Sequence, residues 1–187
     1  DLPWCLTAYG AVGYHVASSA QSWPSATILN AAGDTAALSN GYYDQKVVST
    51  SADVGMRARF NTAGIKHTVM LGVNMLDQQT DYFFLSQSSN VTSNLYRPVA
   101  LPTVTGARGA PTPQSQIRLT SVALTDTLSL ADDRLRITVG LRRQQVYSHS
   151  LADATQTSNK TAISPVLGVV VKPVQNVSLY ANYTAAL

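Results

Sequence analysis

Apolar and polar residues alternate without a break in RLRITVGLR, residues 134–142. One side of this run is apolar and the other is polar or small: Leu135, Ile137, Val139 and Leu141 against Arg136, Thr138, Gly140 and Arg142. Side chains of a β-strand point alternately to its two faces, so a period of two gives one apolar and one polar face. In about ten residues, this pattern predicts a strand that crosses a membrane, with lipid on one side and a polar barrel interior on the other.

The same alternation returns twice near the end of the sequence. The apolar faces are Ile163, Leu167, Val169 and Val171 in one run, and Val177, Leu179, Ala181 and Tyr183 in the next. The opposite faces are Ala162, Ser164, Val166 and Gly168, and then Ser178, Tyr180, Asn182 and Thr184. Three such runs joined by short polar segments predict neighbouring strands of an antiparallel barrel.

The composition agrees with a membrane barrel and excludes several other classes. Charged residues make up 12% of the 187 residues, against about 25% in an ordinary soluble domain. Hydrophobic residues make up 45%, yet the mean hydropathy is only +0.01, and no run approaches the roughly 18 apolar residues of a membrane helix. The net charge is +3 and the basic residues are scattered, so no basic stripe favours nucleic acid. Cys5 is the only cysteine, which excludes an internal disulfide.

Seven long strands are predicted, and no segment carries a helical period. The ranges are 4–17, 46–60, 65–87, 115–130, 134–150, 160–172 and 176–186. Long connections (18–45, 88–114 and 151–159) alternate with short ones (61–64, 131–133 and 173–175). Outer-membrane barrels have tight turns at one rim and long loops at the other. The predicted fold is therefore all-β: an antiparallel up-and-down meander of about seven strands, forming a sector of a large transmembrane barrel.

The first two long connections differ in character. Residues 26–29 and 36–39 flank Ala32-Gly33-Asp34, where glycine supplies a positive φ, so we expect a hairpin inside the first loop. The second contains Pro98, Pro102, Pro111 and Pro113, so we expect it to lack regular structure.

Several motifs follow one another in a recognisable order. They are RARFNTAG (57–64), His67 with LGV (71–73), SNLYRPV (93–99), DRLRITVGLRR (133–143), SPVLGVVVKP (164–173) and NVSLYANY (176–183). Together they resemble the middle of the barrel of TonB-dependent ferric-siderophore receptors. The resemblance covers most of the chain from about Val54 onward.

This resemblance implies a function for a larger protein. Residues 1–187 would be a partial barrel domain, without the family's plug domain and most of its roughly 22 strands, and both ends are expected to be cut. The parent would take up ferric siderophores across the outer membrane of a Gram-negative bacterium. Its partners would be the ferric siderophore, outer-membrane lipid and an inner-membrane complex that supplies energy through the plug.

No catalytic, metal or cofactor site is predicted. The three histidines, His15, His67 and His149, lack metal-ligand spacing, and we expect His67 at the lipid interface near the short-turn rim. Asp132 and Asp133 are expected to form a polar turn rather than an acid–base pair. No serine lies in a Gly-x-Ser-x-Gly elbow. The chain is therefore not expected to be an enzyme.

Four residues are candidates for contact with a ligand. Tyr82 and Phe84 continue the polar face of the third predicted strand beyond the membrane, and Tyr96 and Arg97 follow in the next loop. Arginine donates to anionic oxygens, and tyrosine offers a flat apolar face with a hydroxyl. The alternative is that the aromatic residues serve loop packing or an interfacial girdle.

Two other functions remain open at this point. One is a small autonomous β-barrel that acts as a pore or adhesion scaffold, and the other is a soluble carbohydrate-binding β-sandwich. An isolated barrel sector has two unpaired edges and an apolar face. We therefore expect such a piece to close into a smaller barrel or sandwich, or to pair between chains.

Overall fold

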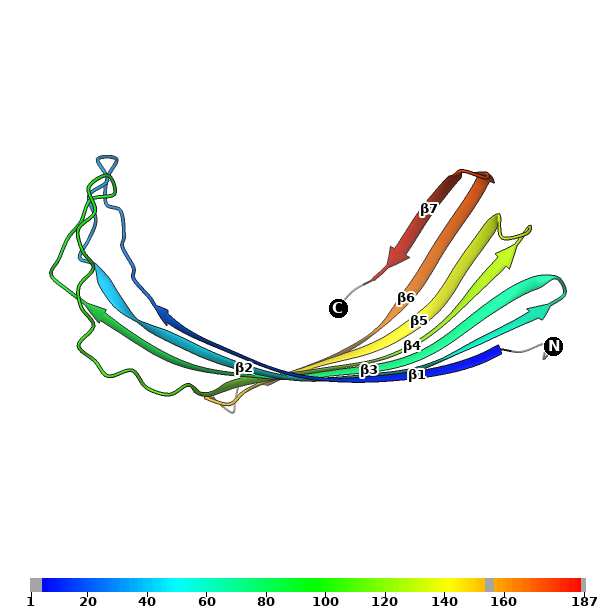
Figure 1. Ribbon diagram of the computed structural model, residues 1–187, viewed down its shortest axis with the longest axis horizontal. Coiled ribbons are helices and arrows are strands. Elements are labelled where there is room, and N and C mark those ends of the chain that lie inside the picture. Colours follow the sequence, from blue (N-terminus) through cyan, green and yellow to red (C-terminus); the bar gives the residue numbers. More distant parts are fainter. Residues whose placement is uncertain (1–4, 154–156, 186–187) are drawn as a thin grey trace. The chain divides into compact units, whose positions relative to one another are not determined.

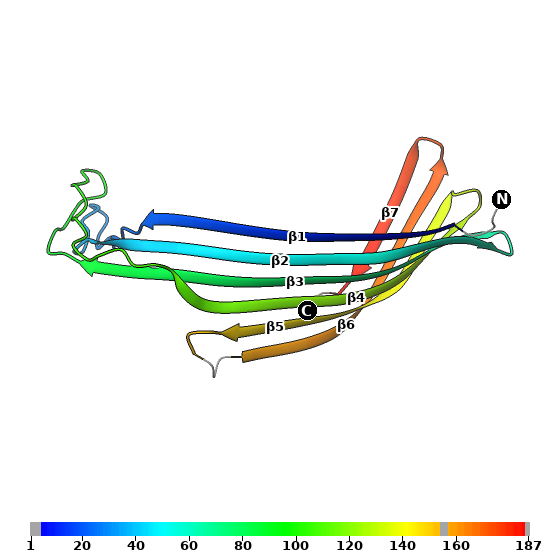
Figure 2. The same cartoon turned by 60° about the horizontal axis from the view of Figure 1, so that its bottom comes forward.

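The computed structural model describes residues 5–153 and 157–185, and these form seven strands (Figure 1). The strands are β1 (Cys5–Ser22), β2 (Ser39–Thr62), β3 (Ile65–Ser88), β4 (Thr112–Leu130), β5 (Leu135–Ser150), β6 (Thr157–Val174) and β7 (Val177–Thr184). They pair in chain order from β1 to β7, and each strand runs back beside the one before it (Figures 1 and 2). The predicted all-β meander is confirmed.

Within the described ranges, no helix is long and apolar enough to cross a membrane.

The register of the last three strands confirms the two faces predicted from the alternation. On one face Val139 pairs with Leu167, and Leu167 pairs with Tyr183. On the other face Thr138 pairs with Gly168, and Gly168 pairs with Asn182. Apolar residues are therefore paired with apolar residues on one face of the sheet, and polar or small residues are paired with polar or small residues on the other.

Two of the three short turns contain residues with positive φ. Ala63 and Gly64 have φ of 49° and 83°, as a two-residue hairpin turn that matches the strand twist requires. Asp132 and Asp133 have φ of 52° and 66°, and aspartate tolerates this conformation better than most residues. The predicted Asp132–Asp133 turn is confirmed.

Strand boundaries differ from the prediction mainly at the first loop. β1 continues to Ser22, and β2 begins at Ser39 rather than at residue 46. Ser, Ala and Gln fill the end of β1 and give no apolar alternation, although backbone pairing does not require it. The predicted first and last strand residues, Trp4 and Ala186, lie outside the described residues, as does part of the connection 151–159.

The last turn is shorter than predicted. β6 includes Pro173 and ends at Val174, which pairs with Val177 across Gln175 and Asn176. The register shifts between Val171 and Val174. A bulge of this kind accommodates a proline, which cannot donate to the ladder, so Pro173 does not end the strand as predicted.

The described residues divide into two compact units. The first contains residues 5–14, 49–78, 116–153 and 157–185, and the second contains residues 15–48 and 79–115. Leu38 is the only buried hydrophobic residue of the described ranges. The other buried residues are glycine or polar: Gly33, Gly41, Thr35, Asp44, Asp81, Ser121 and Ser164. In the described residues, neither unit has the buried apolar core that is typical of a soluble globular domain.

The sheet is open in the described residues. β1 and β7 stand at the two ends of the strand order and do not pair with each other. The expectation that an isolated piece would close into a smaller barrel or sandwich is therefore not met. Large apolar side chains instead remain exposed, among them Leu141 at 59% and Leu179 at 61%.

Candidate functional site

In the second unit, the first two long connections extend the pairing of β2 with β3. Residues 33–38 run beside residues 89–95. Leu38 N donates to Val91 O at 2.7 Å, Thr35 N to Ser93 O at 2.9 Å, and Leu95 N to Gly33 O at 2.8 Å. The segment 89–95 was expected to lack regular structure, and it forms no strand. It nevertheless has fixed backbone partners in the first loop.

The hairpin predicted in the first loop is confirmed. Ser25 pairs with Ser39 and Ile28 with Thr35, and Gly33 has a φ of 84° at the turn. Asp34 fastens this turn to the second loop, because Asn94 Nδ2 donates to Asp34 Oδ1 at 2.9 Å. Asn30 Nδ2 donates to Asp34 Oδ2 at 2.9 Å. The amides of Asn30 and Asn94 hold the pKa of Asp34 below its ordinary value.

The end of the second loop lies against one face of the β2–β3 extension. We call residues 102–111 the strap. Asn40 Nδ2 donates to Pro102 O at 3.0 Å, and Thr105 N donates to Gln87 Oε1 at 2.8 Å. A Cβ built on Gly109 would lie 2.5 Å from the ring of Phe83, so the strap backbone packs directly on that ring.

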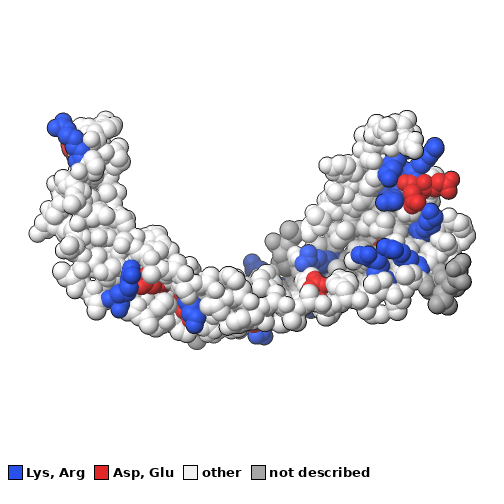
Figure 3. Space-filling view, in the orientation of Figure 1, with Lys and Arg blue, Asp and Glu red and all other residues white. Residues whose placement is uncertain are grey.

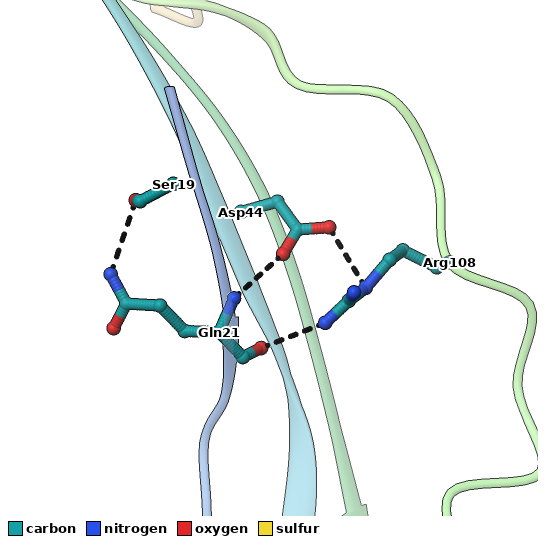
Figure 4. A network of polar contacts seen from close by, with 4 residues as sticks. All are labelled: Ser19, Gln21, Asp44 and Arg108. Carbon is teal, nitrogen blue, oxygen red and sulfur yellow. Dashed lines mark hydrogen bonds and ion pairs between the residues drawn. The ribbon is translucent and has the colours of Figure 1, made fainter. Parts of the chain in front are cut away.

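Arg108 anchors the strap (Figure 4). Its Nε lies 3.0 Å from Oδ2 of Asp44, whose side chain is 8% exposed. Its Nη2 donates to Gln21 O at 3.1 Å, and Gln21 N donates to Asp44 Oδ1 at 3.1 Å. The guanidinium carbon lies 4.2 Å from the centre of the Tyr42 ring. One arginine therefore joins the strap to β1 and β2.

The opposite face of the same strands is aromatic. Side chains alternate along a strand, so Tyr43 points away from Tyr42 and Asp44, and Tyr82 and Phe84 point away from Phe83. The Tyr43 ring centre lies 5.8 Å from that of Tyr82, 6.3 Å from that of Phe84 and 5.2 Å from that of Trp23. We call these four residues the aromatic wall. Phe84 is 50% exposed and Trp23 is 46% exposed.

The four predicted ligand residues fall into two places. Tyr82 and Phe84 belong to the aromatic wall. Tyr96 lies at the loop tip, where its ring would be 2.9 Å from a Cβ built on Gly33, and Arg97 follows it. Between Phe84 and Tyr96 the chain is long enough to extend about 40 Å, and no ring contact joins Tyr96 to the wall in the described residues.

Sequence reasoning missed Trp23, Tyr43, Asp44 and Arg108. Trp23 and Tyr43 were placed in the first loop because the alternation there is weak. Tyr43 sits between Tyr42 and Asp44, so its parity could have been read only if the strand had been extended to this point. Nothing in the sequence indicates that Arg108 contacts Asp44, which is 64 positions earlier.

In the first unit, one face of the strands carries a polar network. Ser121 Oγ donates to Asn74 Oδ1 at 2.7 Å, and Arg142 Nε donates to Ser121 Oγ at 3.2 Å. Thr127 and Thr138 are hydrogen bonded through their hydroxyls at 2.9 Å. These residues come from β3, β4 and β5, and they satisfy one another across the face predicted to be polar.

The other face of the first unit is an apolar belt with a polar cluster at each end. Toward the short turns, His67 Nδ1 lies 2.7 Å from Asp126 Oδ2, and the His67 ring stacks on Phe60 with 4.9 Å between centres. Toward the long connections, Arg118 Nη2 lies 2.7 Å from Asp77 Oδ2. Residues between the clusters include Val69, Leu71, Val73, Leu124, Val139, Leu141 and Leu167. The ten residues from His67 to Asp77 extend about 33 Å along β3.

Charged side chains do not merge into one basic surface. On the face drawn in Figure 3, Lys and Arg occur in small separate groups, often beside Asp, with wide uncharged areas between them.

Comparison with known proteins assigns the chain to a family. A model described as TonB dependent receptor-like, beta-barrel matches residues 1–187. The chain is 30% identical to the ferrichrome receptor FcuA of Yersinia enterocolitica over 97% of this chain and 25% of the relative. It is also similar to the ferric preacinetobactin receptor BauA of Acinetobacter baumannii, with 26% identity, a TM-score of 0.82, and coverage of 95% of this chain and 27% of that one.

A third protein agrees in fold. The siderophore receptor PiuA of Acinetobacter baumannii matches with 18% identity and a TM-score of 0.69 over 96% of this chain and 29% of its own. The chain thus spans about a quarter of the length of the relatives it matches.

Proposed function

Because this chain belongs to the TonB-dependent receptor β-barrel family, we propose that it is a sector of the barrel of an outer-membrane receptor for ferric siderophores. The relatives named above are described as receptors for ferrichrome, ferric preacinetobactin and a siderophore. In this proposal the short turns face the periplasm, and the long connections face the outside of the cell.

The apolar belt supports the membrane location. About 33 Å of strand, tilted as in outer-membrane barrels, corresponds to roughly 25 Å of membrane depth, the height of a lipid-facing band. Polar pairs end the belt on both sides, His67–Asp126 toward one rim and Asp77–Arg118 toward the other. Such pairs fit the two interfaces, where water and head groups meet charged side chains.

The aromatic wall carries the proposed ligand site. The strap covers only the Phe83 face of the β2–β3 extension, which leaves Tyr82, Phe84 and their neighbours uncovered. A ferric chelate has a broad, partly apolar surface and oxygen atoms. The flat faces of the aromatic rings suit the apolar surface, and the tyrosine hydroxyls can bind the oxygen atoms. Tyr96 and Arg97 at the loop tip would meet the chelate first, since arginine attracts anionic oxygens over a distance.

Quenching of tryptophan emission tests the site, because Trp23 belongs to the wall. In the purified receptor that contains this chain, titration with ferric siderophores should quench Trp23. Tyr82→Ala and Phe84→Ala should each raise the Kd about tenfold, as loss of a central aromatic contact usually does. Phe83→Ala is the matched control, since it is the same residue type on the opposite face. Unchanged Kd values in both wall variants would exclude the wall as the binding surface.

Energy coupling is the remaining part of the proposal. If uptake draws on the inner membrane, a protonophore should stop accumulation of radioactive iron in whole cells while leaving siderophore binding to the cell surface intact. Uptake that continues without a proton gradient would contradict energised transport. It would still be compatible with passive passage through a barrel pore.

A further inference from the structure

Asparagine followed by glycine occurs once in the chain, at Asn40-Gly41. This dipeptide is chemically labile, because glycine has no side chain to keep its backbone nitrogen away from the asparagine side chain before it. Asn40 is the second residue of β2, which begins at Ser39, and the end of a strand is where local opening costs least. Asn40 therefore combines a reactive neighbour with a position at which the backbone can adjust.

The two groups that would react are already in contact. Gly41 N donates a hydrogen bond to Oδ1 of Asn40 at 2.9 Å, and Oδ1 is bonded to Cγ, the carbon that the nitrogen would attack. Groups held this close react without the entropy cost of an encounter. The Asn40 side chain is partly exposed, and it lines a polar groove of about 460 Å³ with Gln87 of β3 and Thr103 of the strap. A groove of this size and polarity admits water.

The same side chain holds the strap. Asn40 Nδ2 donates to Pro102 O at 3.0 Å, and Thr105 N donates to Gln87 Oε1 at 2.8 Å. Because side chains alternate along β2, Asn40 lies on the strap face with Tyr42, opposite the aromatic wall. The hydrogen-bond donor that Asn40 gives to the strap is its amide nitrogen, the group that deamidation removes.

We propose that Asn40 is a site of spontaneous deamidation, and that its conversion to a carboxylate loosens the strap on β2. The Gly41 nitrogen gives its proton to water and bonds to Cγ of Asn40. The Cγ–Nδ2 bond breaks, and Nδ2 leaves as ammonia with a proton from water. Water then opens the cyclic imide at either carbonyl, which leaves aspartate or isoaspartate. Neither carboxylate can donate to Pro102 O, and a negative charge then faces an acceptor.

The test follows Asn40 in the intact receptor that contains this chain, purified in detergent and aged in mildly alkaline water labelled with the heavy oxygen isotope. Peptide mass spectrometry should show a gain of about 3 Da at Asn40, because the new oxygen comes from the labelled water. We expect Asn40 to react about tenfold faster than Asn90, an exposed asparagine that is followed by valine. Asn40→Gln is the matched variant. It keeps an amide, but its longer side chain takes the carbon out of the geometry for attack, so no product should form there.

Hydrogen exchange on the same aged samples checks the loosening of the strap. Strap amides, that of Thr105 included, should exchange about tenfold faster in the deamidated fraction, the value of one lost hydrogen bond. Asn40→Asp should show the same acceleration without ageing. Asn90→Asp, which makes the same charge change in the second loop, should show none. The aged wild-type receptor decides the question even if Asn40→Asp does not fold, because its unreacted fraction is an internal reference.

Two results would overturn the inference. One is an Asn40 that reacts no faster than Asn90, which would mean that β2 holds the pair too rigidly for attack. The other is a deamidated receptor whose strap exchanges like that of the unreacted receptor, which would mean that the Asn40 amide contributes nothing to holding the strap.

Discussion

In the second unit, Arg108 Nε and Asp44 Oδ2 lie 3.0 Å apart, and the Asp44 side chain is nearly buried. The pair ties a proline-rich connection to the strands beneath it, and Arg108 also donates to the backbone of Gln21. Because these contacts hold the strap on one face of β2 and β3, the aromatic wall on the opposite face stays uncovered. In the proposed function, the position of the strap therefore determines which surface is available to a ligand.

Removing this anchor should loosen the strap without unfolding the strands. We expect Arg108→Ala to lower the local opening free energy of residues 102–111 by about 2 kcal/mol, because Asp44 is left buried without its cation. Hydrogen exchange of the strap amides measures this change. Arg108→Lys should restore only part of the protection, since an ammonium cannot reach Asp44 and Gln21 with the same fork of donors.

Arg97→Ala is the control for that measurement, because Arg97 is the other arginine of this connection and lies at the loop tip. Its substitution should leave strap exchange unchanged. If Arg108→Ala exchanged like the wild-type receptor, the ion pair would contribute nothing to holding the strap.

Gly41 should tolerate no side chain. A Cβ at this position would collide with the carbonyl oxygen of Leu85, which belongs to the neighbouring strand backbone. Backbone cannot move aside as a flexible side chain can, so Gly41→Ala should separate β2 from β3 locally. Trypsin cleavage near Arg97 and Arg108 should become faster. Gly72→Ala is the control, because its Cβ would meet nothing closer than the Tyr9 hydroxyl at 3.7 Å, and it should fold normally.

The contact between the two loops should depend on pH in an acidic window. Asn30 and Asn94 lower the pKa of Asp34 below the ordinary value of 3.8. A lowered pKa in the folded state means that the ionised carboxylate is the stabilising form. The contact is then fully stable above the ordinary pKa, and it weakens as pH falls through the lowered one.

Hydrogen exchange of residues 89–95 at several pH values checks this expectation. The wild-type loop should keep its protection from neutral pH down to about 4 and lose it at lower pH. Asp34→Asn removes the titrating group, so its protection should no longer change in this window. An equal acid-induced loss in Asp34→Asn would assign the effect to other carboxylates.

The strands with alternating apolar residues could be predicted from the sequence, whereas the strand ends at the first loop could not. The alternation from Leu135 to Leu141 sets both the strand and its apolar face, because burial in lipid imposes a period of two on every spanning strand. In the proposed function, the ends of β1 and β2 at the first loop lie outside the membrane and carry no such constraint. Their pairing comes from backbone hydrogen bonds, which any residue except proline can make, so no pattern marks them.

The ligand candidates divide in the same way. Tyr82 and Phe84 could be proposed as ligand residues because their parity continues along a long patterned strand. Tyr43 and Trp23 join them through contacts between distant segments, which a single sequence does not show. Tyr96 and Arg97 were proposed from their chemistry alone, and that chemistry did not reveal that they lie at the loop tip.

That separation predicts different kinetics for the two places. Tyr96 lies over Gly33 at the tip, so it would meet a ferric siderophore early and leave it before the ligand reaches the wall. Tyr96→Ala should slow association several-fold with little change in dissociation, as expected for a contact made on approach. Tyr82→Ala should mainly accelerate dissociation, because it removes a contact of the bound state. Stopped-flow quenching of Trp23 measures both rates, and a faster dissociation in Tyr96→Ala would place Tyr96 in the final site.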